Sequence, residues 1–451
     1  MNIHPGHCVA IFGGAVSGAE AAYQLSQRGI YVVVFEQHPL PYGKIEDGLP
    51  KWHAKLRDQE EQKIDEKLNN PYVHYVPNTR LGTDIGIREL EEEWGCSAIM
   101  LAIGAWSDRH LPVPGVDEYV NKGLYYQNPL VAWFNHYHEP NYQGPNCQIA
   151  NNTVIIGGGL ASLDVVKIIM IELVQNALVN RGYNMDMFQL ERVGINKVLD
   201  ELKLSLADLG IDKCHLYYRR RVIDMPISPD APPDAPPEKI EKVHQVRKKI
   251  IHHFQSKYLF EFHEQLLPYD KIVEDGRLVG LKFSRTEIVN GVAKPIPETN
   301  VEVKAPLFIS SIGSIPEHIP SIASEGEIFR LKDPAIGKVT GYSNVFALGN
   351  AVTGRGNIKE SFHHGRIVAE WVMNNFLKWK IHDYQKLNES SKYQGSENDS
   401  GSKMLSEEKI RKIMHRVKGL QQKVRYDGNY IEWVKKHRPV RLENLLASQE
   451  K

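Results

Sequence analysis

The sequence predicts an α/β chain built from two Rossmann-like, doubly wound domains. Two glycine-rich turns carry this prediction, one within residues 9–18 and one within residues 154–162, each between an apolar run and a helical pattern. Composition agrees, because 42% of the 451 residues are hydrophobic and the formal net charge is zero. Such a chain can fill the cores of two domains, and its neutrality argues against a general nucleic-acid or membrane-surface binder.

The first turn follows the apolar run Val9–Phe12, which suits a buried parallel strand. Gly13 permits the sharp turn that points helix amides at a pyrophosphate, Ala15 replaces the usual second glycine, and Gly18 leaves room for helix against strand. The next apolar run ends on Glu36, where an acid can accept ribose hydroxyls. An ordinary turn with a surface glutamate is the alternative, but the elements come in the order that dinucleotide binding requires.

The second turn has Gly157, Gly159 and Ser162 at the same spacing, followed by a buried helical pattern. The next apolar run, His215–Tyr218, ends on the arginines at 219–221 and not on an acid. Fixed guanidinium charge there suits the 2′-phosphate of NADP(H), because arginine can contact a phosphate through two nitrogens. A solvated basic turn is the alternative interpretation.

Cysteine usage restricts the redox chemistry. Cys8, Cys96, Cys147 and Cys214 are scattered, with no C-x-x-C pair and no metal-ligand spacing, so we expect packed, reduced thiols and no metal site. The chain thus offers neither a dithiol nor an iron–sulfur cluster, and electrons that reach any flavin bound here must leave to an acceptor outside the chain. No apolar stretch approaches the roughly 20 residues of a membrane span, and the first strand begins almost at once, so we expect a cytoplasmic protein without a signal peptide.

Several segments carry a family resemblance. Residues 36–48 fit E-x-x-x-x-P-x-G-x-x-x-x-G, and with residues 98–104, 111–116 and 308–313, the second turn and the arginines they resemble the adrenodoxin-reductase-type ferredoxin–NADP⁺ reductases. The segments occur in that family's order across about residues 8–378. The resemblance implies FAD at the first turn, NADPH at the second, and delivery of single electrons to a small acidic iron–sulfur protein.

The resemblance also implies site residues. For FAD and its nicotinamide-facing side they are Gly13, Gly14, Ala15, Gly18, Glu36, Gly43, Lys44, Thr79, Gly349, Asn350, Asn357, Ile358 and Lys359. For NADP they are Gly157, Gly158, Gly159, Leu160, Ala161, Arg219 and Arg220. His53 matches a histidine near the isoalloxazine, and Asp230 lies within one residue of a glutamate at the nicotinamide, which makes both candidate catalytic residues. For His53, a residue with no catalytic role is the alternative.

Three positions depart from the family pattern. Asn350 stands where the related reductases carry a tryptophan and wider flavoproteins an aspartate. Asn357 stands in place of a glycine, and Arg355 in place of a proline, where nicotinamide and flavin meet. These departures bear on the pocket expected for the nicotinamide ring more than on the binding of FAD.

A basic helix is predicted beyond the proline-rich stretch 225–237. Its basic residues are Lys239, Lys242, Arg247, Lys248, Lys249, His252 and His253. Apolar residues occupy its other face. In the related family a basic face in this region docks the acidic iron–sulfur partner, and complementary charge speeds encounter. A solvated helix face is the alternative.

The predicted architecture places FAD in a discontinuous domain, residues 1–108 and 332–380, and NADP in residues 109–331. Residues 381–403 have the composition of a flexible linker. Residues 404–451 are predicted as a C-terminal helical extension that packs on its own domain or, alternatively, on a partner.

The predicted function is an FAD-dependent oxidoreductase that passes electrons from NADPH to a ferredoxin-like carrier. One alternative is a flavin-dependent oxidoreductase or monooxygenase acting on a small substrate. The other is a degenerate nucleotide-binding protein, made plausible by Ala15, Asn350 and Asn357. The sequence leaves the oligomeric state open.

Overall fold

The computed structural model describes residues 3–354, 356–379 and 404–449, and the chain divides into two compact units. The first unit comprises Met1–Leu49, His53–Ser107 and Ser314–Lys451, and the second comprises Pro50–Trp52 and Asp108–Gly313. The return to the first unit therefore falls earlier than residue 332, where the sequence analysis placed it. The predicted linker at residues 381–403 lies outside the described residues.

A seven-stranded sheet forms the centre of the first unit, in the order β17-β18-β19-β4-β1-β2-β3. Its strands are β1 (Cys8–Phe12), β2 (Tyr31–Phe35), β3 (Val73–Val76), β4 (Ala98–Leu101), β17 (Leu331–Asp333), β18 (Lys338–Val339) and β19 (Val345–Ala347). Strands β3, β2, β1, β4 and β19 pair in parallel, and β17 and β18 extend the sheet by antiparallel pairing. Every residue of β1 and β2 is buried, as expected of parallel strands covered on both faces.

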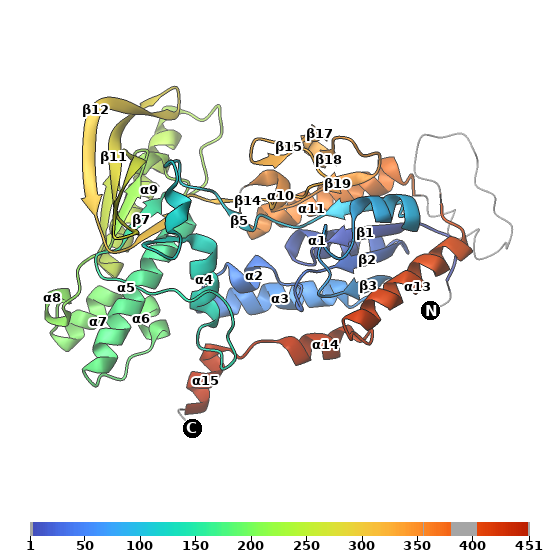
Figure 1. The fold of residues 1–451 in the computed structure, drawn as a ribbon, viewed down its shortest axis with the longest axis horizontal. Coiled ribbons are helices and arrows are strands. Elements are labelled where there is room, and N and C mark those ends of the chain that lie inside the picture. The colour runs from blue at the N-terminus through green and yellow to red at the C-terminus, as the bar shows by residue number, and fades with distance from the viewer. Residues whose placement is uncertain (1–2, 355, 380–403, 450–451) are drawn as a thin grey trace. The chain divides into compact units, whose positions relative to one another are not determined.

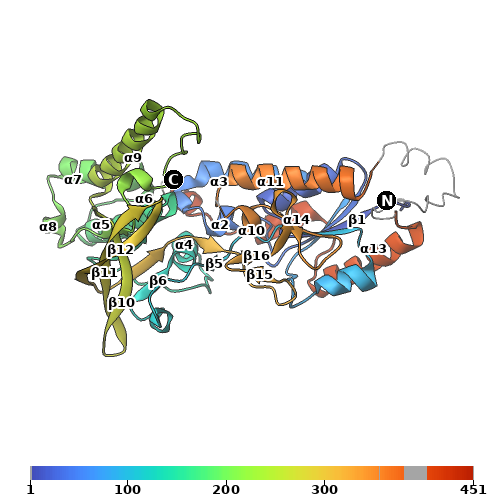
Figure 2. The same ribbon diagram turned by 90° about the horizontal axis from the view of Figure 1, so that it is seen from above.

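Helices cover both faces of this sheet. The helices and helical turns are α1 (Val16–Ser26), α2 (Lys44–Asp47), α3 (Ala54–Leu68), η2 (Glu89–Trp94), η5 (Pro334–Ile336), α10 (Asn350–Thr353), α11 (Ile358–Trp371), η6 (Val372–Phe376), α13 (Glu407–Lys423), α14 (Tyr430–His437) and α15 (Leu442–Gln449). On one face α1, α3 and α11 pack with Val9 and Ile11, and Figure 2 shows α3 and α11 on the same side of the sheet. On the other face η2 and α13 pack with Ala10 and Phe12.

The C-terminal extension is part of the first unit. Ile410, Ile413 and Val417 of α13 are buried in the same apolar cluster as Phe35 and Trp94. The helix, red in Figure 1, contacts β3. The prediction of a helix packed on its own domain is confirmed, because the apolar stripe of α13 covers one face of the sheet.

The second unit contains five parallel strands in the order β6-β13-β7-β8-β9 and an antiparallel three-stranded sheet. The strands are β6 (Leu124–Tyr126), β7 (Val154–Gly157), β8 (His215–Tyr218), β9 (Glu261–Glu264), β10 (Leu266–Glu274), β11 (Arg277–Val289), β12 (Val292–Lys304) and β13 (Phe308–Ser311). The antiparallel sheet covers one face of the parallel sheet, where the rings of Tyr217 and Phe283 stack at 4.8 Å.

The other face of the parallel sheet is covered by helices, of which α5 contacts β7, β8 and β13. The helices and turns of this unit are η3 (Val116–Tyr119), α4 (Gln127–His136), α5 (Leu160–Asn180), α6 (Met187–Val193), α7 (Ile195–Leu202), α8 (Leu206–Leu209), η4 (Val222–Asp224) and α9 (Pro237–Tyr258). Remaining short elements of the chain are η1 (Lys51–His53) and the strand pairs β5 (Ser107–Asp108) with β14 (Ser314–Ile315), and β15 (Ser324–Glu325) with β16 (Ile328–Phe329). Both units are therefore parallel sheets with helical connections, as the sequence predicted.

Candidate functional site

The first glycine turn leaves the carboxyl end of β1 and enters α1. Gly13 has φ +93°, and a Cβ added there would lie 2.4 Å from the carbonyl oxygen of Ala102. A Cβ at Gly18 would lie 1.8 Å from the carbonyl oxygen of Gly13. Both positions therefore require glycine for space, and Gly13 requires it also for its left-handed backbone.

The N-terminus of α1 presents its amides at this turn. Ala15 is the N-cap residue and has no capping side chain, and the first turn of α1 contains no acid. Gly43, with φ +53°, packs against the same place, because a Cβ added to it would lie 3.0 Å from Cβ of Ala15. Helix amides without a side-chain cap are suited to a phosphate group.

The carboxylate of Glu36 lies at the same turn and is only 4% exposed. Its Oε2 accepts a hydrogen bond of 2.9 Å from the Gly14 amide, and its Oε1 accepts one of 3.1 Å from the His38 amide. Burial raises the pKa of Glu36, and the hydrogen bond from the Gly14 amide opposes that rise. The amide of Thr79 donates to the Glu36 carbonyl oxygen at 2.8 Å, so the structure brings Gly14, Glu36 and Thr79 together.

Lys44 adds a cation near this turn. Its Nζ lies 3.0 Å from Oγ of Ser314 and 5.9 Å from the ring centroid of Trp106. The Trp106 ring also lies 5.5 Å from the ring of His38. Sequence reasoning did not single out Trp106, although an aromatic side chain two residues beyond Gly104 was an available signal.

The end of β19 reaches the start of α1. Gly349 has φ +68°, and a Cβ there would lie 2.3 Å from Oγ of Ser17. The Gly349 amide donates to Nδ1 of His364 at 3.0 Å, and burial lowers the pKa of His364, which favours the neutral acceptor ring. Sequence reasoning missed His364 because a single histidine within a helical pattern gives no signal.

The two asparagines that depart from the family pattern have partners within the chain. Oδ1 of Asn350 accepts a hydrogen bond of 2.7 Å from the Gly356 amide. Oδ1 of Asn357 accepts one of 2.7 Å from the Glu360 amide and so caps α11. Asparagine is among the preferred N-cap residues, which gives Asn357 a structural reason to be there.

The remaining residues of this segment begin α11. Ile358 packs partly against the apolar cluster beneath the sheet, whereas Lys359 is exposed. Arg355, the third departure from the family pattern, lies outside the described residues.

The second glycine turn leaves β7. A Cβ added to Gly157 would lie 2.4 Å from the carbonyl oxygen of Ser311 and 2.6 Å from Cβ of Ser162. A Cβ at Gly158 would lie 2.1 Å from the ring of Tyr218, which packs directly on the turn. Tyr218 was not singled out from sequence, where it read only as the last residue of a strand.

The turn leads into α5 through Gly159, the N-cap residue, which has open space around it. Leu160 and Ala161 form the first turn of the helix, with Leu160 exposed and Ala161 partly buried. No side chain caps the N-terminus of α5. This turn therefore resembles the first in leaving helix amides at the carboxyl edge of a parallel sheet.

The three arginines after β8 have unequal surroundings. Arg221 forms a two-point ion pair with Asp224, at 2.9 and 3.0 Å. Arg220 lies 3.7 Å from Asp224, and its Nε is buried without a hydrogen-bond partner. Arg219 is exposed, and within the described part of the chain no ion pair of its guanidinium is found. Arg219 and Arg220 thus keep hydrogen-bonding capacity that Arg221 lacks.

Neighbouring strands fix the backbone of this arginine turn. Oγ1 of Thr286 donates to the Arg219 carbonyl oxygen at 2.7 Å, and the Gln265 amide donates to the Arg220 carbonyl oxygen at 3.1 Å. Oε2 of Glu264, the last residue of β9, accepts from the Val222 amide at 2.6 Å. The position of the guanidinium groups therefore depends on β9 and β11.

Arg247 was predicted on the exposed basic face, and this prediction is wrong. The residue is 5% exposed and donates to the carbonyl oxygens of Ile223 at 2.7 Å and Ser228 at 3.1 Å. It also pairs with Asp230, whose side chain is 86% exposed. Arg247 therefore supplies donors to one carbonyl group of the η4 turn and one of the irregular proline-rich segment that follows it.

The other basic residues of α9 are exposed. They are Lys239, Lys242, Lys248, Lys249, His252 and His253. Two of the apolar residues on the other face of the helix, Ile240 and Val246, are also exposed, whereas Ile251 is buried. The helix therefore packs mainly through its C-terminal half and presents a basic surface, defined by the four lysines.

The two candidate catalytic residues belong to different units. His53 precedes α3 in the first unit and is partly buried. Asp230 belongs to the second unit, where it accepts from Arg247.

All four cysteines are buried and none forms a disulfide. Cys8 and Cys96 are not scattered in space: a hydrogen bond to Cys96, with burial, raises the pKa of the Cys8 thiol. Cys8 begins β1, whereas the glycine turn follows the other end of that strand, about 13 Å away at 3.3 Å per residue. The pair therefore lies at the opposite end of β1 from the glycine turn.

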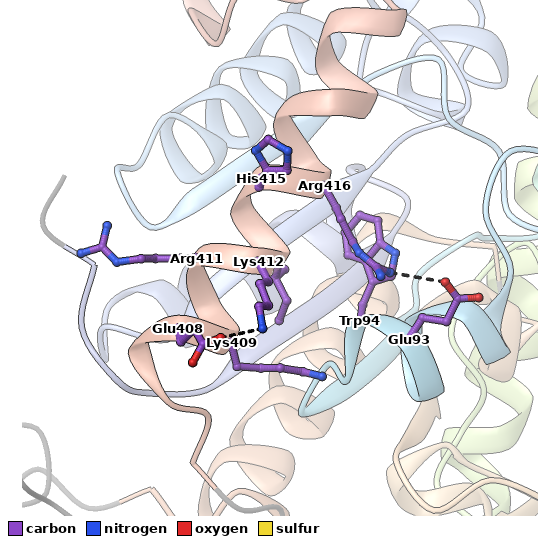
Figure 3. A pocket seen from close by; sticks show the side chains of 9 residues that line it. Glu93, Trp94, Glu408, Lys409, Arg411, Lys412, His415 and Arg416 are labelled. Carbon is purple, nitrogen blue, oxygen red and sulfur yellow. Dashed lines mark ion pairs between the residues drawn. The ribbon is translucent and has the colours of Figure 1, made fainter.

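An open cavity of about 500 Å³ lies between η2 and α13 (Figure 3). Its lining residues are Glu93, Trp94, Glu408, Lys409, Arg411, Lys412, Ile413, His415 and Arg416. Arg416 pairs with Glu93 and Lys412 with Glu408. None of the residues predicted to bind a nucleotide lines this cavity.

Comparison with known proteins supports the family resemblance. No protein-family model matches the chain. It is 28% identical over 166 residues to a probable mitochondrial NADPH:adrenodoxin oxidoreductase of Schizosaccharomyces pombe, a match that covers 36% of this chain and 34% of that protein. It is 29% identical over 178 residues to the NADPH-ferredoxin reductase FprA of Mycobacterium leprae, covering 38% and 37%.

This chain is related to the adrenodoxin-reductase-type reductases. The sequence matches span about a third of the length of these relatives. The structural similarity covers more of the chain than the sequence matches do. The structure of Mycobacterium tuberculosis FprA in complex with NADPH aligns with a TM-score of 0.66 at 18% identity, covering 93% of this chain and 91% of that one. The fold of these reductases, with two Rossmann-like domains, is therefore confirmed. Across the described residues, no helix combines the length and the apolar character needed to cross a membrane.

Proposed function

We propose that this chain is an FAD-dependent oxidoreductase that passes electrons from NADPH to a ferredoxin-like iron–sulfur carrier. One observation carries the proposal: the two glycine turns are alike, but the strand after the first ends on buried Glu36, and the strand after the second ends on Arg219 and Arg220. An acid suits ribose hydroxyls and arginine suits a 2′-phosphate, so the turns select different dinucleotides. The named activities of the relatives are in accord with this choice.

The first turn fits FAD. The space that a Cβ would fill at Gly13 and Gly18 is closed by backbone, so the chain turns tightly enough to aim the α1 amides at a pyrophosphate. The residues proposed to hold FAD are Gly13, Gly14, Ala15, Gly18, Glu36, Gly43, Lys44, Thr79, Gly349 and Asn350. Trp106, whose ring lies 5.9 Å from Nζ of Lys44, extends this set on the side of Gly43.

The second turn fits NADPH. The buried Nε of Arg220 without a partner and the exposed guanidinium of Arg219 are donors of the kind that a 2′-phosphate requires. The residues proposed to hold NADPH are Gly157, Gly158, Gly159, Leu160, Ala161, Arg219 and Arg220. The assignments of His53, Asp230, Asn357, Ile358 and Lys359 near the reacting rings stay predictions.

A flavin supplies the chemistry that converts a two-electron hydride donor into a source of single electrons. The chain's own residues position the nucleotides, and its cysteines offer the electrons no acceptor, because none of the four forms a disulfide that could be reduced. An acceptor outside the chain is therefore required. We propose that an acidic carrier docks on the α9 surface of Lys239, Lys242, Lys248 and Lys249, where exposed charge is concentrated.

Absorbance of the purified protein tests this function. We expect a flavin spectrum that bleaches when NADPH is added without oxygen. We also expect NADPH to support faster reduction of an added ferredoxin than NADH does. A colourless protein to which FAD does not bind would support the degenerate nucleotide-binding alternative. Bleaching followed by oxygen-dependent turnover of a small substrate, with no ferredoxin reduction, would support the monooxygenase alternative.

A further inference from the structure

Three metal-ligating side chains meet on the edge of the second unit's parallel sheet. His215 begins β8, and Glu261 and His263 lie on the edge strand β9. The strands pair in register, His215 opposite Glu261 and Tyr217 opposite His263. Because side chains alternate along a strand, all three project from the same face of the sheet.

The distances among their ligand atoms match a tetrahedral metal site. Nδ1 of His215 lies 3.0 Å from Nε2 of His263 and 3.6 Å from Oε2 of Glu261, and the last two atoms are 3.9 Å apart. A tetrahedron with bonds of about 2.0–2.1 Å has edges of about 3.3–3.4 Å. The three atoms therefore need shifts of only a few tenths of an ångström to surround one ion.

The surroundings hold these side chains in place. The His263 ring stacks on Tyr217 at 4.5 Å, and Tyr217 stacks on Phe283. Lys213 approaches the other carboxylate oxygen of Glu261, Oε1, at 3.9 Å, so Oε2 still faces the imidazoles. His215 and His263 are partly exposed and Glu261 is exposed, which leaves a path for an ion.

We propose that His215, Glu261 and His263 bind a divalent transition-metal ion, most naturally Zn²⁺, with water in the fourth position. Two imidazoles and one carboxylate form an established zinc ligand set. The ion cross-links the edge strand β9 to β8. Because Glu264 and Gln265 at the end of β9 hold the backbone of the arginine turn, the site steadies the segment that carries Arg219 and Arg220.

A neutral histidine pair joined by a hydrogen bond is the competing interpretation, since 3.0 Å suits either arrangement. Measurements of metal binding distinguish the metal site from the histidine pair. The untagged full-length protein is stripped with a chelator, dialysed and titrated with Zn²⁺ by calorimetry, and with Co²⁺ while the visible absorption is recorded. We expect one equivalent of bound Zn²⁺, a tetrahedral Co²⁺ spectrum, and a higher unfolding temperature with metal.

Variants identify the residues. In His215→Gln, His263→Gln and Glu261→Gln we expect the affinity for Zn²⁺ to fall at least tenfold and the metal-dependent rise in unfolding temperature to disappear. His252→Gln, at an exposed position on α9, is the matched control and should bind as the wild type does. Glu261→Gln, on the partly exposed edge strand, serves if either histidine variant fails to fold. Absence of stoichiometric Zn²⁺ binding in the wild type, or binding unchanged in all three variants, overturns the proposal.

Discussion

At the residue scale, the unequal surroundings of three adjacent arginines allow a sharp prediction. Replacing Arg219 and Arg220 with alanine should weaken NADPH binding by about 2 kcal/mol or more, roughly 30-fold, because charge-assisted hydrogen bonds to the 2′-phosphate are lost. Binding of NADH should change little, since NADH lacks that phosphate. Fluorescence titration with both nucleotides measures the difference.

Arg221→Ala is the control for this pair, because Arg221 is already engaged by Asp224. It should affect NADPH less than the double variant does. Equal loss of NADPH and NADH affinity in the double variant would assign these arginines to folding and not to the phosphate.

A second residue-scale prediction concerns Gly13. Gly13→Ala places a Cβ 2.4 Å from the Ala102 carbonyl oxygen in a left-handed conformation, so the turn must open. We expect the purified Gly13→Ala variant to contain no bound FAD. The matched control is Gly86→Ala in the same unit, where an added Cβ meets no atom within 4 Å.

The ratio of flavin to protein absorbance, with far-UV circular dichroism as a check on folding, measures the outcome. Stoichiometric FAD in a folded Gly13→Ala variant would show that the first turn does not bind the pyrophosphate.

At the element scale, buried ion pairs join the C-terminal region to α2 and α3, next to the segment that we propose binds FAD. Arg441 contacts Glu46 of α2 through both terminal nitrogens and Glu61 of α3 at 2.6 Å. Burial raises the pKa of Glu61 to about 7, the charge of Arg441 opposes this rise, and that of Glu46 adds to it. Helix α2 begins at Lys44, directly after Gly43, so the tail supports the segment that we propose contacts FAD.

The raised pKa of Glu61 predicts that the stability of the folded protein depends on pH. Glu61 titrates near 4.5 when unfolded and near 7 when folded, so the folded state binds its proton more tightly. Its contribution to stability is complete below about pH 4.5 and is lost as the pH rises through 7. The change in unfolding temperature from pH 5 to pH 8 should therefore be more negative in the wild type than in Glu61→Gln.

Glu66→Gln, at an exposed position of the same helix, is the control and should keep the wild-type pH dependence. If Glu61→Gln also keeps it, another group titrates in this range.

Sequence reasoning predicted elements whose signals are local. Both glycine turns, the basic helix α9 and the packed helix α13 follow from spacing within a few residues. It placed the return to the first unit at residue 332, later than Ser314, because the strands between these positions, β14, β15 and β16, have only two residues each and show no periodicity. It placed Arg247 in solvent because the carbonyl groups that Arg247 satisfies belong to an irregular segment about 20 residues earlier. The His215, Glu261 and His263 cluster exists only through strand pairing, which spacing does not reveal.

At the scale of the whole molecule, association with a carrier depends on clustered charge and not on the net charge of zero. Reversing Lys248 and Lys249 to glutamate should slow ferredoxin reduction at low salt by about tenfold or more, because electrostatic steering changes association rates by 10 to 1,000-fold. Reduction of a small neutral dye should not change. Stopped-flow mixing measures both rates.

The control carries the same charge change on another helix, Lys435→Glu with Lys436→Glu on α14, where both lysines are exposed. Added salt should slow the wild type, since screening shortens the field to about 8 Å at physiological ionic strength. If the rate of ferredoxin reduction changes neither with salt nor with the charge reversal at Lys248 and Lys249, the carrier docks on another surface.

The strand order of the first unit also governs how the chain folds as it is made. Strand β4 finds its neighbour β19 only after residues 102–344 have been synthesised. At roughly 5–20 residues per second, the backbone groups on this edge of β4 stay unpaired for about 12–50 s while that partner is made. Almost all of the second unit is one continuous stretch, Asp108–Gly313, and is complete first. An exposed, unpaired strand edge invites pairing with other chains, so we expect newly made copies of this protein to aggregate most readily in the interval before residue 345 is made.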